Sequence, residues 1–302
     1  YYRVTEGTMV QTASATITGG SATWGATTTF VETGPPALLA DLEFSGDGQT
    51  AAITYVTRAY DPDKDFRVLT ATAAISGTTQ TWSAPHDFGV VTGNDPRLAL
   101  SSDGSTAAVV WKEDAGPILL ATAHVSGATQ TWEASNQTLS TMGDAPEVSL
   151  SADGGAVAAT WYENYTTVNA AVGTVDASGN ATMGSASTWA SSGIAQIQLS
   201  GDGSKVVLLY GVANKVTSTT GQVSGTTATW GASSTLSGAD VFIGRLAIAS
   251  SGASAIASWH VNDVSGTVIV QAAVPFVSSS SSAKNFGKSD KTAESGSRSR
   301  GD

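Results

Sequence analysis

A segment of about fifty residues recurs along this chain, and the repeat limits the folds that the chain can adopt. Its most regular part is an apolar strand, a Ser-x-Asp-Gly turn and a second apolar strand that ends in an aromatic residue. The copies are Leu42–Tyr55, Leu98–Trp111, Val148–Trp161, Ile197–Tyr210 and Leu246–Trp259, the last with Ser251 in place of Asp. The Asp-Gly pair supplies the backbone of a two-residue hairpin loop, and the flanks alternate apolar with small or polar residues. Each copy therefore predicts a β-hairpin.

A second landmark, a Thr-Trp pair, recurs at the same interval. It stands at Trp24, Trp82, Trp132 and Trp230, with Met183 in the corresponding place of one copy. Between the two landmarks lies a third apolar segment, clearest at Ile118–Val125. Four strands in about fifty residues make one propeller blade. The sequence therefore predicts an all-β fold, a β-propeller of four-stranded antiparallel blades, of which five are visible.

Large aromatic residues are predicted to pack between the blades. A single sheet of this kind has two weakly apolar faces and buries neither, whereas radial stacking buries both. The aromatic residues that end each second strand, together with the Trp24 series, supply the buried ring area that such a core needs. Trp189 lies outside both series, and we expect it in a loop or at the end of a strand.

The two ends of the repeat array are complementary. The N-terminal part supplies a third and a fourth strand, Met9–Ile17 and Ala22–Phe30, whereas the C-terminal part supplies a first, a second and a third strand, Arg245–Ala249, Ser254–His260 and Thr267–Val274. Because strand exchange removes exposed sheet edges, we expect the C-terminal strands to accept the N-terminal outer strands and close the ring. The competing interpretation is a fragment of a six- or seven-bladed propeller.

The composition indicates two segments in the chain and excludes some classes of binding partner. We assign residues 1–277 to the propeller domain and residues 278–302 to a disordered Ser-rich tail, since the tail has few apolar residues. The net charge of −11, with 14 Lys and Arg against 25 Asp and Glu, argues against nucleic acid and anionic membrane surfaces as partners. No apolar run approaches the ~20 residues of a spanning helix, so membrane insertion is not expected. Without cysteine, a disulfide, a thiolate metal site and a cysteine nucleophile are all excluded.

The pattern from Ser101-Ser102-Asp103-Gly104 through Trp111 resembles the hairpin of TolB-like propellers, which also combine a serine, an Asp-Gly turn and an apolar strand. This resemblance spans about five repeats and implies a propeller fold. A weaker likeness links Ser151–Gly155 to the Asp-box of sialidase propellers.

One position of the repeat is polar in every copy but differs in chemistry. The first residue of the first strand is Asp41, Arg97, Glu147, Gln196 or Arg245, while the first and third residues after it are apolar in every copy. Because the innermost strands line the axis of a propeller, these five side chains are predicted to surround one mouth of the central channel. Convergent groups of this kind suit a small polar ligand or a carbohydrate. The alternative is that these side chains are simply solvated at the starts of the strands and that their charges contribute little to stability.

A candidate calcium site lies in the longest repeat. Asp61, Asp63 and Asp65 have the D-x-D-x-D spacing that can direct three carboxylates toward one hard cation. An EF-hand loop would have Gly at Phe66 and Glu at Thr72, so a Ca²⁺ site would need ligands from elsewhere, and a solvated acidic loop is the favoured interpretation. We expect no other cofactor.

For function, the leading interpretation is a non-catalytic, secreted or cell-surface propeller that binds a ligand, a glycan or a protein surface. The alternative is a carbohydrate-active enzyme on the same scaffold, such as a glycoside hydrolase, a sialidase-like enzyme or a lyase. A glycosidase needs two carboxyl groups that face each other across a cleft. Asp41, Glu113, Asp114 and Glu163 are candidates by blade position, so whether the protein is an enzyme stays open at this point.

Overall fold

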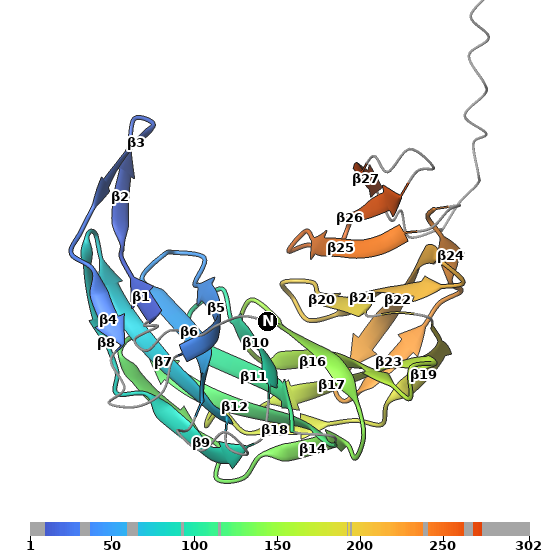
Figure 1. Cartoon of the computed structure of the whole chain (residues 1–302), viewed down its shortest axis with the longest axis horizontal. Helices are drawn as coiled ribbons and strands as arrows, with labels where there is room; N and C mark the ends of the chain where they lie inside the picture. The colour runs from blue at the N-terminus through green and yellow to red at the C-terminus, as the bar shows by residue number, and fades with distance from the viewer. Residues whose placement is uncertain are drawn as a thin grey trace, which may run out of the picture.

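The computed structural model describes residues 10–30, 37–58, 66–91, 94–113, 116–191, 193, 195–237, 241–262 and 268–273. Every regular element among these residues is a β-strand. The strands form antiparallel sheets that lie side by side in an arc around a common centre (Figure 1). The predicted all-β propeller fold is therefore confirmed.

Four sheets form the middle of the arc, and each has five strands. The first contains β5 (Ala37–Phe44), β6 (Thr50–Arg58), β7 (Phe66–Ser76), β8 (Thr79–Trp82) and β9 (His86–Val91), and the second contains β10 (Asn94–Leu100), β11 (Thr106–Lys112), β12 (Ile118–Ser126), β13 (Thr129–Trp132) and β14 (Gln137–Ser140). The third contains β15 (Asp144–Leu150), β16 (Ala156–Glu163), β17 (Thr167–Val175), β18 (Ala181–Met183) and β19 (Ser187–Ala190), and the fourth contains β20 (Ala195–Leu199), β21 (Lys205–Val212), β22 (Lys215–Ser224), β23 (Thr227–Trp230) and β24 (Ser234–Thr235).

The fifth strand of each sheet arises because the outer strand is split in two. In the second sheet, β13 pairs with Ala123–Ser126 of β12, while β14 pairs with the other end of β12, at Ile118–Leu120. The same division occurs at β8 and β9, at β18 and β19, and at β23 and β24. A blade of this protein is thus a four-stranded unit with a broken outer edge.

The ends of the arc do not exchange strands as predicted. The C-terminal sheet contains β25 (Val241–Ile248), β26 (Ala255–Asn262) and β27 (Val268–Ala273), and β27 takes the place beside β26. The N-terminal strands β1 (Val10–Thr12), β2 (Ala15–Thr18), β3 (Ser21–Trp24) and β4 (Thr28–Phe30) pair only with each other in the described chain, and Figure 1 shows them at the opposite end of the arc. The predicted ring closure is therefore wrong for the described strands. The predicted boundary of the Ser-rich tail lies outside them.

The Ser-x-Asp-Gly turn is longer than the two-residue loop predicted. Ser45 and Thr50 close the loop through Ser45 N and Thr50 O at 2.9 Å, and within it Gly48 N donates to Ser45 O at 2.9 Å. Gly48 has a φ of +70°, whereas Asp47 has an ordinary negative φ. Asp47 instead stabilises the turn through its side chain, because its Oδ1 accepts hydrogen bonds from Ser45 Oγ at 2.7 Å and from Gln49 N at 2.9 Å.

The same turns connect neighbouring blades through backbone hydrogen bonds. The donor and acceptor pairs are Gly46 N to Ser102 O at 2.6 Å, Asp103 N to Ala152 O at 3.0 Å, Ala152 N to Gly201 O at 2.8 Å and Gly201 N to Ser250 O at 2.7 Å. Three of the four donors, Gly46, Ala152 and Gly201, occupy the same position of the repeat, so successive blades are linked in nearly the same way.

A cluster of large side chains repeats at the blade interfaces. Each cluster combines the split outer strand of one blade with the second strand and the outer strand of the next blade. The members are Phe30, Tyr55 and Trp82; Phe88, Trp111 and Trp132; Leu139, Trp161 and Met183; and Trp189, Tyr210 and Trp230. The predicted packing of aromatic residues between blades is confirmed at these interfaces.

Two tryptophans depart from the regular pattern. Trp189 lies near the end of β19, which is one of the two expected places, and its ring meets that of Trp230 edge to face at 4.8 Å, because the split outer strand adds an aromatic position to the repeat. Trp24 belongs to the regular series but is 67% exposed, since the described part of its own sheet is only the β2–β3 hairpin. An aromatic side chain is therefore buried here only where two blades stack.

Two glycines of the repeat separate the effect of backbone conformation from that of packing. Gly48 and Gly154 have φ values of +70° and +69°, but a Cβ at Gly154 would lie 2.2 Å from Thr106 Oγ1, while one at Gly48 would meet nothing within 4 Å. We expect Gly154→Ala to lower the free energy of unfolding by about 2–4 kcal/mol and Gly48→Ala by about 1–2 kcal/mol in urea titrations. Equal losses would show that the turns do not pack between blades.

Candidate functional site

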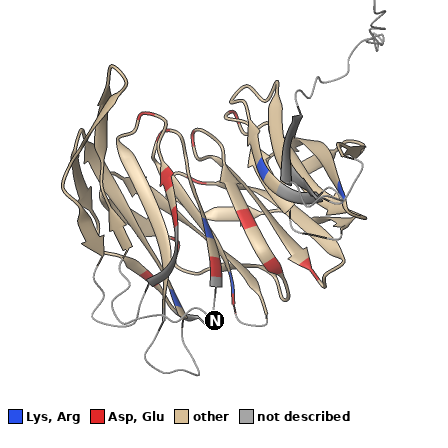
Figure 2. Ribbon diagram, turned by 45° about the horizontal axis from the view of Figure 1, so that its top comes forward, with Lys and Arg blue, Asp and Glu red and all other residues tan. Residues whose placement is uncertain are grey.

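The five predicted axial residues stand on the innermost strand of five successive sheets. Asp41 is on β5, Arg97 on β10, Glu147 on β15, Gln196 on β20 and Arg245 on β25. Charged residues also lie on other described strands (Figure 2). Four of the five axial residues are charged, so the inner strands carry a row of mixed charge.

Local irregularities shape the inner strands just before two of these residues. The β10–β11 register shifts between Asn94 and Arg97, and the β15–β16 register shifts between Asp144 and Glu147. Asp95 and Ala145, which have φ values of +60° and +45°, lie in these bulges, and each is followed by a proline. A bulge next to a proline redirects the strand, so the side chain that follows turns toward the neighbouring blade.

Glu147 is the centre of the strongest contact among the axial residues. Its Oε1 accepts hydrogen bonds from Arg97 Nε at 3.2 Å and from Gln196 Nε2 at 2.8 Å, which come from the two adjacent blades. The side chain of Glu147 is only 18% exposed. Burial raises the pKa of Glu147, and Arg97 partly offsets this rise. Its second oxygen, Oε2, accepts no hydrogen bond from the described chain.

Arg97 lies between two carboxylates. Besides Glu147, its guanidinium contacts Asp95, with Nη2 2.9 Å from Oδ1. Burial by itself would lower the pKa of Arg97, but the carboxylates of Asp95, Glu147 and Asp41 together raise it. Arg97 therefore stays cationic and holds the Glu147 carboxylate in one orientation.

Asp41 is bound by backbone, whereas Glu43, two residues further on, is not bound at all within the described chain. Asp41 Oδ2 accepts a hydrogen bond from Leu98 N of the next blade at 3.0 Å, and Oδ1 accepts one from Leu42 N at 3.1 Å. Burial, together with the charge of Asp41, raises the pKa of Glu43 to about 7, although Arg245 opposes the rise. Glu43 is thus a half-buried carboxyl group that changes its charge near neutral pH.

The predicted row is brought together in part. Direct contacts join Arg97, Glu147 and Gln196, and Asp41 contacts the backbone of the same blade as Arg97. Arg245 is exposed and acts on Glu43 and Glu147 through its charge. That these residues bind a ligand stays a prediction.

Sequence reasoning missed Glu43. The repeat could have revealed it, because the corresponding positions of the other copies hold residues without charge: Ala99, Ser149, Gln198 and Ala247. Asp41 and Glu43 are two residues apart on one strand, so their side chains lie on the same side of the sheet.

The remaining candidate residues give no second site within the described part of the chain. Asp61, Asp63, Asp65 and Asp114 lie outside the described residues, and no group of three His, Cys, Asp or Glu side chains in the described chain could hold a metal ion. Glu163 accepts a hydrogen bond from Asn169 Nδ2 at 2.8 Å within its own blade. No helix long and apolar enough to cross a membrane occurs in the described part.

No family model and no curated protein matches this chain, but solved structures are similar to it. A protein from Lactobacillus plantarum has a TM-score of 0.50 at 15% identity, covering 88% of this chain and 78% of that chain. The periplasmic gluconolactonase of Pseudomonas aeruginosa has a TM-score of 0.44 at 15% identity, covering 77% and 71%. TolB from Acinetobacter baumannii has a TM-score of 0.38 at 15% identity, covering 78% and 54%.

These similarities bear on two expectations. The resemblance to TolB-like propellers is supported, at low identity, and the shared feature is the fold. The leading functional interpretation, a non-catalytic binding module, is wrong by this comparison, because a propeller named as a gluconolactonase is among the similar structures.

Proposed function

We propose that this protein is a hydrolase whose axial site opens lactones of sugar acids. The observation that supports the proposal is Glu43, a half-buried carboxyl group near Asp41 and Arg245, with a pKa of about 7 and no hydrogen-bond donor in the described chain. A general base is most effective when its pKa lies near the working pH. Glu43 has this property without a metal or a histidine.

The reaction uses one base and one cation. Deprotonated Glu43 takes a proton from water as the water oxygen adds to the lactone carbonyl carbon, and the carbonyl oxygen becomes negative. Arg245 supplies positive charge for this oxyanion. The ring C–O bond then breaks, the leaving oxygen receives the proton from Glu43, and the product is the open-chain hydroxy acid. Glu43 returns to its starting state, so the atoms and charges balance.

The neighbouring groups suit a substrate rich in hydroxyl groups. Glu147 Oε2 is an acceptor, and its orientation is fixed because Arg97 and Gln196 both bind Oε1. Placed polar groups of this kind orient a small ligand and determine its specificity. We therefore assign Arg97, Glu147 and Gln196 to substrate binding and Glu43 and Arg245 to the chemical step.

A lactone fits this site better than a glycoside. Glycoside hydrolysis requires two free carboxyl groups, one as acid and one as base or nucleophile. Asp41 accepts two backbone hydrogen bonds, and Glu147 is held by Arg97 and Gln196, so each has a positioning role already. Lactone hydrolysis requires only one such group. The proposal keeps the predicted location outside the cytoplasm; the Pseudomonas relative carries a periplasmic location in its name.

The direct test is a substrate panel with the purified chain. We expect release of acid from glucono-δ-lactone above the spontaneous rate, and no release of nitrophenol from 4-nitrophenyl glycosides. Because Glu43 must be deprotonated, the enzymatic kcat/KM should rise with pH and level off above about pH 7. Turnover of glycosides instead of lactones would show that the proposed substrate class is wrong. Turnover of neither would show that the proposed hydrolase activity is wrong.

A further inference from the structure

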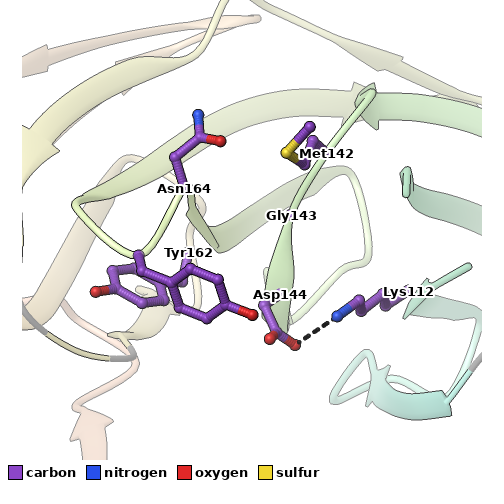
Figure 3. Close-up of a pocket in the computed structure, with 7 residues that line it drawn as sticks. Lys112, Met142, Gly143, Asp144, Tyr162 and Asn164 are labelled. Atoms are coloured by element: carbon purple, nitrogen blue, oxygen red, sulfur yellow. Dashed lines mark ion pairs between the residues drawn. The ribbon is translucent and has the colours of Figure 1, made fainter. Parts of the chain in front are cut away.

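A pocket lies between the second and third five-stranded sheets, beside the start of the inner strand β15. Its volume is ≈ 270 Å³, and its lining comes from the end of β11, the segment before β15 and the β16–β17 turn. Figure 3 shows the side chains of Lys112 and Asp144 next to Tyr162, with Met142 and Asn164 on the opposite side of the space. Typical pockets for drug-sized ligands start near ~300 Å³, so this one suits a single small ring.

The turn at the rim places an aromatic ring in solvent at a conformational cost. Asn164 and Tyr165 both have positive φ, +52° and +56°, and Tyr165 is 76% exposed. The second position of such a turn favours glycine or asparagine, and a tyrosine there is strained. The next blade makes the same kind of turn with Ala213 and Asn214, at +46° and +63°. The turn by itself therefore does not require an aromatic residue.

The exposed ring is held in place. Tyr162 is only 9% exposed and meets Tyr165 edge to face, with ring centroids 6.0 Å apart. Such aromatic pairs restrict the orientation of the outer ring. Tyr165 thus presents a fixed flat apolar face next to the pocket instead of a freely moving side chain.

Polar groups and a tight backbone complete the pocket. Asp144 Oδ1 contacts Lys112 Nζ at 3.3 Å and accepts a hydrogen bond from Ala145 N at 2.9 Å, so the carboxylate is fixed. Gly143 lies between the sheets, where a Cβ would be 2.5 Å from Ile118 Cγ1 and 3.1 Å from Trp161 Cδ1. Any other residue at this position would clash with Ile118, so the close packing of this segment requires glycine.

We propose that this pocket binds a pyranose ring, with its C–H face against Tyr165 and its hydroxyl groups near Asp144, Lys112 and Asn164. A sugar has both an apolar ring face and a polar rim, which matches one aromatic face beside fixed charged groups. Asp144 precedes Glu147 by three residues on β15, so the pocket lies within about 10 Å of the axial row. This inference rests on the proposed function for one consequence: the preferred lactone carries a second sugar residue.

The experiment measures binding separately from turnover. Saturation-transfer NMR with maltose, cellobiose and lactose, none of which is a lactone, should show binding of at least one disaccharide to the wild-type chain. Tyr165→Asn, which suits the turn because Asn214 occupies the same position one blade later, should weaken that binding at least about tenfold. Tyr165→Phe should retain it, and Trp24→Ala, which removes an exposed ring elsewhere, should leave it unchanged.

The outcomes distinguish this site from the axial site. Disaccharide binding that Tyr165→Asn does not weaken, or binding of none of the three sugars, overturns the pocket, even if glucono-δ-lactone is hydrolysed. If binding depends on Tyr165 but the chain hydrolyses no lactone, the proposal of a sugar-binding pocket is supported and only the proposal of lactone hydrolysis is contradicted. If both hold, the lactone of cellobionic or maltobionic acid should have a higher kcat/KM than glucono-δ-lactone in the wild type, and Tyr165→Asn should abolish the difference.

Discussion

Glu43→Gln should reduce kcat/KM for glucono-δ-lactone by at least about 100-fold at neutral pH, because the amide cannot accept the proton of the attacking water. The substitution keeps the size of the side chain and removes its charge, so the sheet can fold as before. The remaining activity should lose its dependence on pH near 7, which is the pKa of Glu43. The measurement is a pH series of initial rates, corrected for spontaneous lactone opening.

Glu133→Gln is the matched control for this experiment. Burial also raises the pKa of Glu133, but this residue accepts its hydrogen bonds from Thr122 N and Gln137 at the outer edge of a blade, far along the sheet from the inner strand. Its replacement should leave the rate and its pH dependence unchanged. If Glu43→Gln retains full activity, the base is another group and the assignment of Glu43 is wrong.

Glu43→Gln should also change the thermal stability of the protein, in a direction that the raised pKa of Glu43 determines. A carboxyl group whose pKa is about 7 when folded and near 4.5 when unfolded binds its proton more tightly in the folded state. Its contribution is therefore greatest at low pH and is lost as the pH rises through 7. Glu43→Gln lacks this loss, so its Tm should exceed that of the wild type at about pH 8 and approach it at about pH 4.

Trp111→Ala should lower the free energy of unfolding by about 3–5 kcal/mol, the range for removing a large aromatic side chain from a core. Trp111 is fully buried between two blades, where its ring lies 4.9 Å from that of Phe88. Its indole N–H has no hydrogen-bond partner in the described chain, so we expect the loss to come from apolar burial and packing. Urea titration followed by circular dichroism measures it.

Trp24→Ala provides the comparison within the same protein. Its ring is 67% exposed, so the substitution should change the free energy of unfolding by less than about 0.5 kcal/mol. Similar losses for the two variants would mean that Trp24 is covered in solution and that the ends of the arc carry a contact beyond the described strands. A small loss for Trp111→Ala would contradict the stacked-blade core.

The split outer strand and the open arc illustrate where pattern analysis reached its limit. The Thr-Trp pair marks only the first half of the outer strand. The second half is short, as in Ser234–Thr235, and therefore has too few residues to show a hydrophobic period. Ring closure depends on whether the strand edges of the N-terminal and C-terminal sheets pair with each other, and these sheets are far apart in the sequence. The strand pattern at Thr267–Val274 is compatible with either partner, and only the observed pairing of β27 with β26 decides between them.

The repeat period, the strand order and the positions of the turns followed from the sequence alone, because they depend on residues close together in the chain: Gly48 and its counterparts supply the left-handed backbone, and alternating apolar residues define the strands. The chemistry of the axis was decided by the tertiary structure. Asp41, Glu43 and Glu147 are all carboxylates on inner strands; the repeat marks Glu43 as unusual, but nothing local shows which of the three lacks a hydrogen-bond donor. Within the described chain, neighbouring blades supply donors to Asp41 and to Glu147 but none to Glu43, and burial raises the pKa of Glu43. Because a pKa depends on burial and on charges brought near by folding, the proton-accepting group could be recognised only once the blades were in place.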